Sequence, residues 1–459
     1  MVAADSRGRA HAAHAADRPD ELRLDKVIER GMRLVDPRTG IIQGLHDLPL
    51  ETNDPRLFHV AAPLTDTSRY HAIQCYRHNG GAALTRHRAV VCAIGEAVER
   101  YCAGMYDPDA GIEATPEEIG DRGVPPWRFV LFSDAQYRRE DFPMSRPRKD
   151  TVFRWVKGRS LTRGLEVYVP ACFVYVPYRF RAKSEAVTVP ISTGLACGSS
   201  RDEAVLRGIY EVVERDAFSI TWLNRIPAPR LEIGGARNRE LVEVARRFRE
   251  VGLEICVNLA VTDLGIPVVI TLSLDWSGAG PASVIAARAD FDVEHAVLRS
   301  LEETAQTRLW GKKLMRDRPD YKPEPGFTDV KKGEDHVRLF CDGDMAGYLD
   351  FLTGAPSAGD IGSLEAPPTG GTADEIAKCV ALLSSNGFET IAVDITTPDV
   401  AEVGFHVVRV LIPGLQPLDM DFNWRYLGGT RLYEAPVKMG FADRVASENN
   451  LNPIPHPFP

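Results

Sequence analysis

The sequence lacks the short signatures that mark most cofactor sites. It contains no C-x-x-C pair, no H-E-x-x-H, no G-x-G-x-x-G and no G-x-x-x-x-G-K-[ST]. A zinc site of the usual spacing, a dinucleotide fold and a P-loop are therefore not expected. The eight cysteines lie far apart, between Cys75 and Cys379, so most are expected to be small buried hydrophobic side chains rather than a disulfide framework.

Long apolar runs and an excess of positive charge are also absent. No stretch approaches the roughly 18 apolar residues of a membrane-spanning helix, and the start of the chain has no apolar signal core. The 55 basic residues are outnumbered by 64 acidic ones, which gives a net charge of −9 and argues against binding to nucleic acid or to an anionic membrane. We therefore expect a cytoplasmic protein in which residues 1–25 form a disordered N-terminal tail.

The chain does contain the pattern of an α/β protein, in the mixed α+β sense. Apolar segments at 165–177, 254–263 and 267–275 predict strands, and helical patterns alternate with them. The segments 316–336 and 355–372, which are polar or rich in Gly and Pro, indicate loops or boundaries. A helix, a glycine and a strand follow, which predicts a small C-terminal α/β subdomain at about 372–459 that ends in a Pro-rich tail.

One short pattern, E-x-x-E-R, occurs twice. It stands in VCAIGEAVERYC (91–102) and in IYEVVERDAF (209–218), each time within a helical pattern that has one apolar face. A third helical pattern, VEHAVLRSLEETAQTRLW, places Glu303 and Gln306 one turn apart. The polar faces of the first two helices gather Glu96, Glu99, Arg100, Glu203, Glu211 and Glu214.

These polar faces have two interpretations. A helix with Glu and Arg on its solvent face is common in proteins, and the helical wheel alone favours it. The other interpretation is a shared cleft, because Mg²⁺ prefers carboxylate oxygens and arginine binds phosphate oxygens in pairs. Carboxylates from three helices would then form an ATP–Mg²⁺ site without a glycine loop.

Several motifs, in order, resemble those of the YcaO family. CAIGEAVERY (92–101), STGLACGSSRDEAVLRGIYEVVERDAF (192–218) and SLEETAQTR (300–308) resemble its three nucleotide-site motifs. VVRVLIPGLQPL (407–418), RYLGGTRLYEAP (425–436) and NPIPHPFP (452–459) resemble its azoline-forming branch, and in particular the discrete catalytic D-type subunit. The resemblance covers residues 30–459 and implies a YcaO-like catalytic domain, with mixed sheets, flanking helices and an ATP cleft lined by Glu-bearing helices.

The resemblance implies an ATP-dependent peptide cyclodehydratase. In that reaction a Cys side chain, or a Ser or Thr, of a ribosomally made precursor attacks the preceding carbonyl, the amide oxygen is phosphorylated, and phosphate leaves to give a thiazoline or oxazoline. The implied cofactors are ATP and Mg²⁺. The implied ATP-binding residues are Glu96, Glu99, Arg100, Ser199, Glu203, Glu211, Glu214, Arg215, Glu303 and Gln306, with Glu96, Glu99, Glu211, Glu214 and Glu303 as the Mg²⁺ ligands.

The sequence departs from the family pattern at four positions. Ala82 stands where many relatives have a lysine, which removes one cationic phosphate contact. Thr193 and Ser199 replace asparagines but still offer hydroxyl groups. Cys92 replaces a serine, and we expect it to pack rather than to act as a nucleophile, because the sequence indicates no base or cation beside it.

The tail PIPHPFP (453–459) has alternating prolines, which favour an extended rod. Chain ends are usually disordered, and that is the alternative interpretation. The resemblance implies an active-site element instead. We expect the Pro459 carboxylate to move a proton in catalysis, and we expect His456 to pack or to form hydrogen bonds.

The resemblance also implies partners. These are the precursor peptide, a separate leader-binding protein of the E1-like (ThiF-like) kind, and a second copy of the chain in a homodimer within a larger complex. A flavin dehydrogenase that oxidises the rings is a further candidate. Two other functions stay open: a different backbone activation, such as thioamide or amidine formation, and a catalytically silent scaffold. Ala82 favours the scaffold, whereas six retained motif glutamates oppose it.

Overall fold

The computed structural model describes residues 18–69, 74–260, 262–364 and 370–459. Only part of the segment expected to form a disordered N-terminal tail, residues 1–25, belongs to the described residues. Residues 18–25 belong to helix α1 (Arg18–Met32), so the segment expected to be disordered is helical there, and residues 1–17 lie outside the described residues. No helix among the described residues combines the length and the apolarity that a bilayer crossing requires.

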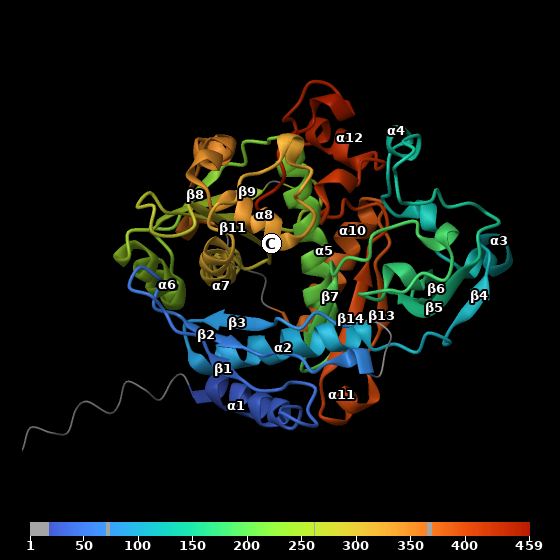
Figure 1. Ribbon diagram of the computed structural model, residues 1–459, viewed down its shortest axis with the longest axis horizontal. Coiled ribbons are helices and arrows are strands. Elements are labelled where there is room, and N and C mark those ends of the chain that lie inside the picture. Colours follow the sequence, from blue (N-terminus) through green and yellow to red (C-terminus); the bar gives the residue numbers. More distant parts are fainter. Residues whose placement is uncertain (1–17, 70–73, 261, 365–369) are drawn as a thin grey trace, which may run out of the picture.

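Three sheets and their helices form the molecule (Figure 1). The longer helices are α2 (Arg86–Gly104), α5 (Arg201–Leu223), α6 (Arg239–Glu250), α7 (Val293–Asp317), α8 (Gly333–Phe340), α10 (Thr372–Ser385) and α12 (Arg431–Lys438). The short helices are α3 (Pro116–Ile119), α4 (Asp134–Tyr137), α9 (Asp350–Thr353) and α11 (Pro398–Glu402). The mixed α+β class expected from the sequence is confirmed.

The first sheet has the antiparallel order β1-β2-β3, and the second has the order β11-β10-β9-β8-β12 with one parallel pair, β12 with β8. Their strands are β1 (His46–Asp47), β2 (Phe58–Ala61), β3 (Gly80–Ala83), β8 (Arg230–Glu232), β9 (Glu254–Ala260), β10 (Val268–Leu274), β11 (Ser283–Ala289) and β12 (Ser357–Asp360). Every residue of β10 is buried, including the polar Thr271 and Ser273.

The third sheet joins residues that are far apart in the chain. Its order is β4-β5-β13-β14-β7, with β6 paired to β5. The strands are β4 (Ile112–Ala114), β5 (Phe153–Ser160), β6 (Leu165–Pro170), β7 (Leu195–Gly198), β13 (Ile391–Asp394) and β14 (His406–Leu411). Because β13 and β14 lie between β5 and β7, residues 372–459 do not form the separate subdomain expected from the sequence.

Helix α5 lies between the five-stranded and the six-stranded sheet and packs on both (Figure 1). It is buried along most of its length, including Phe218 and Trp222 on one side and Glu214 and Asp216 on others. A helix that is buried all round belongs to the interior of a large protein. Polar side chains on such a helix therefore need partners inside the molecule, and α5 carries two of the predicted glutamate sites there.

Candidate active site

Three helices meet near the centre of the molecule, and each begins at a side-chain cap. Thr85, Ser200 and Asp292 precede α2, α5 and α7, and each accepts a hydrogen bond from the backbone N–H three residues later. A fixed start determines which residues of a helix face inward. In Figure 1, α5 and α7 lie on either side of the letter C that marks the C-terminal end of the chain, and α2 lies below it.

Five of the predicted glutamates lie together at this meeting point. They are Glu96 and Glu99 of α2, Glu211 and Glu214 of α5, and Glu303 of α7. After the larger effect of burial, the charge of Glu211 contributes to a raised pKa at Glu99, Glu214 and Glu303, each of which belongs to a different helix. The helices therefore turn their polar faces toward one another and not toward solvent.

Burial is the main influence on these carboxyl groups. Opposed by Arg100 and Arg215 respectively, burial raises the pKa of Glu99 and of Glu214 to about 8. Glu214 is only 2% exposed, and its Oε2 has no hydrogen-bond partner. Converging buried carboxylates with an unpartnered oxygen fit a hard divalent cation, because such a cation takes oxygen ligands and restores the ionised form.

The two predicted arginines lie beside these carboxylates. Arg100 Nη1 is 3.7 Å from Glu99 Oε1, Arg215 Nη1 is 2.7 Å from Glu214 Oε1, and Arg215 Nη2 is 3.6 Å from Glu211 Oε1. Each arginine offsets part of the negative charge on its own helix. Both also keep donors for a phosphate group, since a guanidinium carries five N–H groups.

Two arginines at this position were not predicted from the sequence. Arg288 of β11 lowers the pKa of Glu214 and Glu303, and Arg409 of β14 lowers that of Glu99, each against the larger effect of burial. Arg409 is 4% exposed, its Nε and Nη1 have no partner, and burial lowers its pKa to about 10. A single arginine within an otherwise apolar strand, as in SVIAARA and HVVRVL, is the sequence signal that could have identified both.

Glu203 and Ser199 lie at the start of α5, about two turns before Glu211, and Gln306 lies in α7, one turn after Glu303. The backbone N–H and the hydroxyl of Ser199 both donate to Glu203 Oε2, at 2.9 and 2.6 Å, and Arg207 Nη2 donates to Oε1 at 2.6 Å. Glu203 is therefore held in local contacts at the start of α5. Gln306 lies beside Gly80, whose N–H donates to Glu96 Oε2 at 2.8 Å.

The positions that depart from the family pattern have different surroundings. Ala82 is buried in β3, opposite His59. Thr193 lines an apolar pocket together with Arg409, so this pocket adjoins the carboxylates. Cys92 receives a hydrogen bond from Arg299 Nη2 at 3.0 Å, so a cation that the sequence did not indicate lies beside this thiol. Arg299 comes from α7, more than 200 residues later, and no local pattern reveals it.

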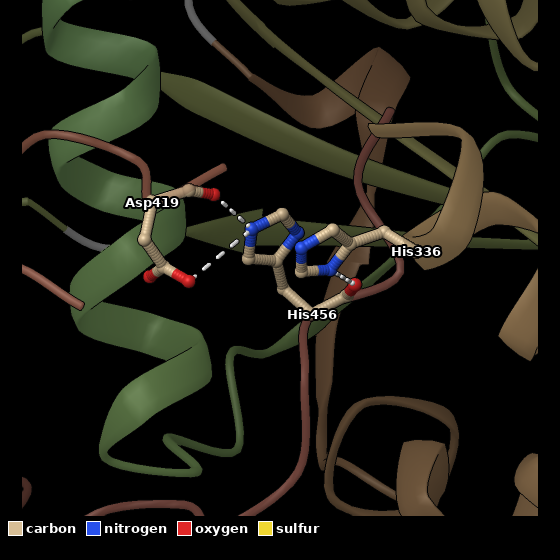
Figure 2. A group of neighbouring side chains, drawn as sticks. All are labelled: His336, Asp419 and His456. Carbon is tan, nitrogen blue, oxygen red and sulfur yellow. Dashed lines mark hydrogen bonds and ion pairs between the residues drawn. The ribbon is translucent and has the colours of Figure 1, made fainter. Parts of the chain in front are cut away.

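The Pro-rich tail is buried, not frayed. Phe458 is fully buried, and the guanidinium carbon of Arg215 lies 4.1 Å from the centre of its ring. His456 packs face to face on His336, with ring centres 3.9 Å apart (Figure 2). Its Nε2 lies 2.7 Å from the carbonyl oxygen of Asp419. The tail thus reaches the residues that adjoin the glutamate cluster.

Solved structures resemble this fold over most of its length. A heterocyclase in complex with substrate and cofactor has a TM-score of 0.78 at 26% identity, over 95% of this chain and 57% of that one. This chain therefore spans little more than half the length of that heterocyclase. YcaO from Methanopyrus kandleri, bound with AMPPCP and Mg²⁺, has a TM-score of 0.60 at 25% identity, over 88% and 92% of the two chains.

A third structure, the Escherichia coli microcin synthetase McbBCD complex with pro-MccB17 bound, has a TM-score of 0.56 at 14% identity, over 81% of this chain and 87% of that one. At this identity the likeness concerns the fold alone. The sequence pattern of the family described as YcaO cyclodehydratase, ATP- and Mg²⁺-binding, matches residues 80–416 and includes all five clustered glutamates. The chain therefore belongs to the YcaO family, whose domain binds ATP and Mg²⁺.

Proposed function

We propose that this chain is the catalytic subunit of an azoline-forming cyclodehydratase, which converts Cys, or alternatively Ser or Thr, of a ribosomally made peptide into thiazoline or oxazoline. One observation carries the proposal: the buried tail ends beside Arg215, and the same arginine contacts the clustered glutamates. A nucleotide site and a separate acid–base group would thus adjoin each other, as an ATP-dependent cyclisation requires.

In this proposal, the glutamate cluster holds Mg²⁺ and the surrounding arginines bind phosphate oxygens. ATP with Mg²⁺ supplies the phosphoryl group that turns the amide oxygen into a leaving group. Arg100 and Arg215 offset charge beside the carboxylates, and Arg409 adds a buried cation whose Nε and Nη1 are free to donate. Positioning and electrostatic stabilisation are the main contributions that a protein makes to phosphoryl transfer.

The tail would supply the proton transfer. Ring closure forms a bond from sulfur or oxygen to the carbonyl carbon, and the thiol or hydroxyl proton and the amide N–H proton must both leave. We assign the uptake of one of them to the Pro459 carboxylate. His456 is a weaker candidate, because its Nε2 faces a carbonyl oxygen and its pKa is lowered by burial to about 4.

The precursor peptide and a separate leader-binding protein are the proposed partners. The fold shared with a heterocyclase solved with its substrate, and with a synthetase complex solved with a bound peptide, supports both. A homodimer within the complex and a flavin dehydrogenase belong to the same proposal.

The test replaces Glu99 or Glu214 by glutamine, which keeps the shape and removes one charge. We expect peptide cyclisation to fall by about two to three orders of magnitude, with folding intact. ADP release and loss of water from the peptide are measured with the partner and precursor present. The matched control is Glu250→Gln, which removes an exposed glutamate that pairs with Arg246 on α6 and should change neither readout.

Each other outcome points to a different function. Near-normal cyclisation in both variants would show that these helices do not form the nucleotide site. ADP release without loss of water from the peptide would favour another backbone activation, such as thioamide or amidine formation. An absence of peptide-dependent turnover in the unaltered protein would favour the silent scaffold.

A second test concerns the tail. Deleting residues 457–459 removes the proposed base, which is typically worth about 10²–10⁴ in rate, and adding one residue moves the carboxylate by about 3.5 Å. We expect both variants to lose cyclisation more than nucleotide affinity. Cyclisation at the normal rate by the extended protein would remove Pro459 from the mechanism.

A further inference from the structure

The tail follows one side of α5 toward the glutamate cluster. The N–H of Asn452 donates to Leu223 O at 2.7 Å, and Trp222 Nε1 donates to Ile454 O at 3.1 Å. Further along, the Phe458 ring lies 4.7 Å from the ring of Phe218. Residues 452–458 therefore run antiparallel to α5, from its C-terminal end back toward Arg215. These contacts with α5 fix the direction of the tail. A second element must hold the tail on the side that faces away from α5.

Helix α8 provides that opposite side and contacts the tail twice. His336 Nδ1 lies 2.7 Å from His456 O, as Figure 2 shows, and the His336 ring is fully buried. One turn earlier, Gly333 lies so close to the end of the tail that an added Cβ would be 3.1 Å from the carboxyl carbon of Pro459. Gly333 and His336 are three residues apart and thus share one face of the helix.

Helix α8 is itself held firmly. Its Asp335 accepts hydrogen bonds from the N–H groups of Lys331 and Lys332 at 3.2 and 3.1 Å, and Arg318, which follows the end of α7, donates to Asp335 at 2.7 Å. All of its residues but Glu334 are buried. Helix α7 also carries Glu303. The end of α7 therefore holds α8, which contacts the tail, and the same helix contributes to the glutamate cluster.

The group of His336, Asp419 and His456 in Figure 2 is close enough to suggest a metal site, but its geometry does not fit one. The two rings are stacked with an interplanar angle of 8°, so their in-plane lone pairs run side by side rather than converging. Both nitrogens of His336 already face carbonyl oxygens, those of His456 and Met420. The group therefore orders the tail through hydrogen bonds and stacking.

We propose that Gly333 and His336 are positioning residues for the reaction: together they set where residues 456–459 lie between α8 and α5, and so hold the Pro459 carboxyl group at the nucleotide site. This inference rests on the cyclisation function proposed above. Gly333 acts by having no side chain, because any Cβ would press on the Pro459 carboxyl group. His336 acts by donating to the tail backbone three residues before its end.

The main test is Gly333→Ala. Alanine is a better helix former than glycine, so the substitution by itself should not weaken α8. Because the added Cβ would be 3.1 Å from the carboxyl carbon of Pro459, that carbon must shift by a few tenths of an ångström, and a misplaced catalytic group lowers the rate. We expect kcat for cyclisation to fall several-fold at saturating precursor peptide, with the KM for the peptide, the ATP affinity and the melting temperature close to those of the unaltered protein.

The matched control is Gly343→Ala, which also places alanine at the first position of a helical segment, but where an added Cβ meets nothing within 4 Å. It should cyclise normally. At His336, asparagine can still donate to the tail carbonyl and leucine cannot, so His336→Asn should retain several-fold more cyclisation than His336→Leu.

Two outcomes would overturn the proposal. One is normal cyclisation by Gly333→Ala while the protein lacking residues 457–459 is inactive. The other is an equal loss of ATP affinity and cyclisation, which would make α8 a support of the fold and not of the tail. If the shortened protein itself cyclises normally, the failure lies instead in the role proposed for Pro459.

Discussion

Glu99 and Glu214 have raised pKa values, and in the proposed Mg²⁺ site they would link metal binding to proton release. Burial raises both pKa values to about 8, well above the usual 4.5, so in the ligand-free protein these groups carry protons at neutral pH. A group with a raised pKa stabilises the folded state fully below pH 4.5, and this contribution disappears as the pH rises through about 8. The two carboxyl groups share charged neighbours, so the protonation of one affects the protonation of the other.

We therefore expect Mg²⁺ with ATP to displace protons when it binds at pH 7. Affinity should increase from pH 6 to about 8.5 and then level off, because the ligand needs the ionised carboxylates. Calorimetry in two buffers of different ionisation enthalpy counts the protons released. Glu214→Gln, which has no proton to lose at that position, should release fewer. A pH-independent affinity over this range would contradict the assignment of these glutamates as ligands.

The sequence predicted the five clustered glutamates because their spacing is local: Glu96 and Glu99, or Glu211 and Glu214, lie one turn apart on their own helix. A lone arginine in an apolar strand marks Arg288 and Arg409 as unusual, but the sequence does not place them at the cluster, because that position depends on the pairing of strands far apart in the chain. The same limit applies to Cys92, whose cation comes from α7.

Two elements that the sequence separates, α5 and α12, are joined by a buried ion pair. Arg431 of α12 donates to both oxygens of Asp216 at 2.8–3.0 Å, and Asp216 also accepts the N–H of Gln416 at 2.8 Å. Asp263 binds the other edge of the same guanidinium. The pair therefore anchors the C-terminal segment to the helix that carries Glu211 and Glu214.

We expect Asp216→Asn to lower the free energy of unfolding by about 1.5–3 kcal/mol, because it weakens the charged hydrogen bonds to Arg431 while Asp263 still compensates the guanidinium. Thermal unfolding measures the change. Asp109→Asn is the control, since Asp109 forms an exposed bridge with Arg181 of the kind worth about 1 kcal/mol or less. Equal melting temperatures for the two variants would show that the buried pair contributes little.

At the scale of elements, the sequence predicted where strands occur better than how they pair. The segments 254–263 and 267–275 became β9 and β10 with ends shifted by up to three residues. The segment 165–177 holds a strand only to Pro170, because a turn of 3-10 helix follows at Ala171–Phe173. A pattern with period two shows that a strand exists but not which strand it pairs with, and this is why the position of β13 and β14 between β5 and β7 was missed.

For the molecule as a whole, the glutamate cluster lies where the three sheets come together. Helix α2 packs on the three-stranded sheet and on β7, α7 packs on the five-stranded sheet and on β3, and α5 packs between the two larger sheets. Ligand sites often lie at such junctions, because each side can supply residues without changes to the others. In the proposed nucleotide site, three helices and two strands supply the charged groups in place of a glycine-rich loop.

Helix α5 also determines when this site can exist during folding. Its backbone and side chains bond to Pro417, Asn452 and Ile454, about 200 to 230 residues later in the chain. The entropy of closing such long loops must be overcome before these contacts give any stability, so they form late. The chain can therefore acquire most of its helices and hairpins while its glutamates are still far apart. In a refolding experiment we therefore expect the ability to bind ATP to return in the last phase and not in the first.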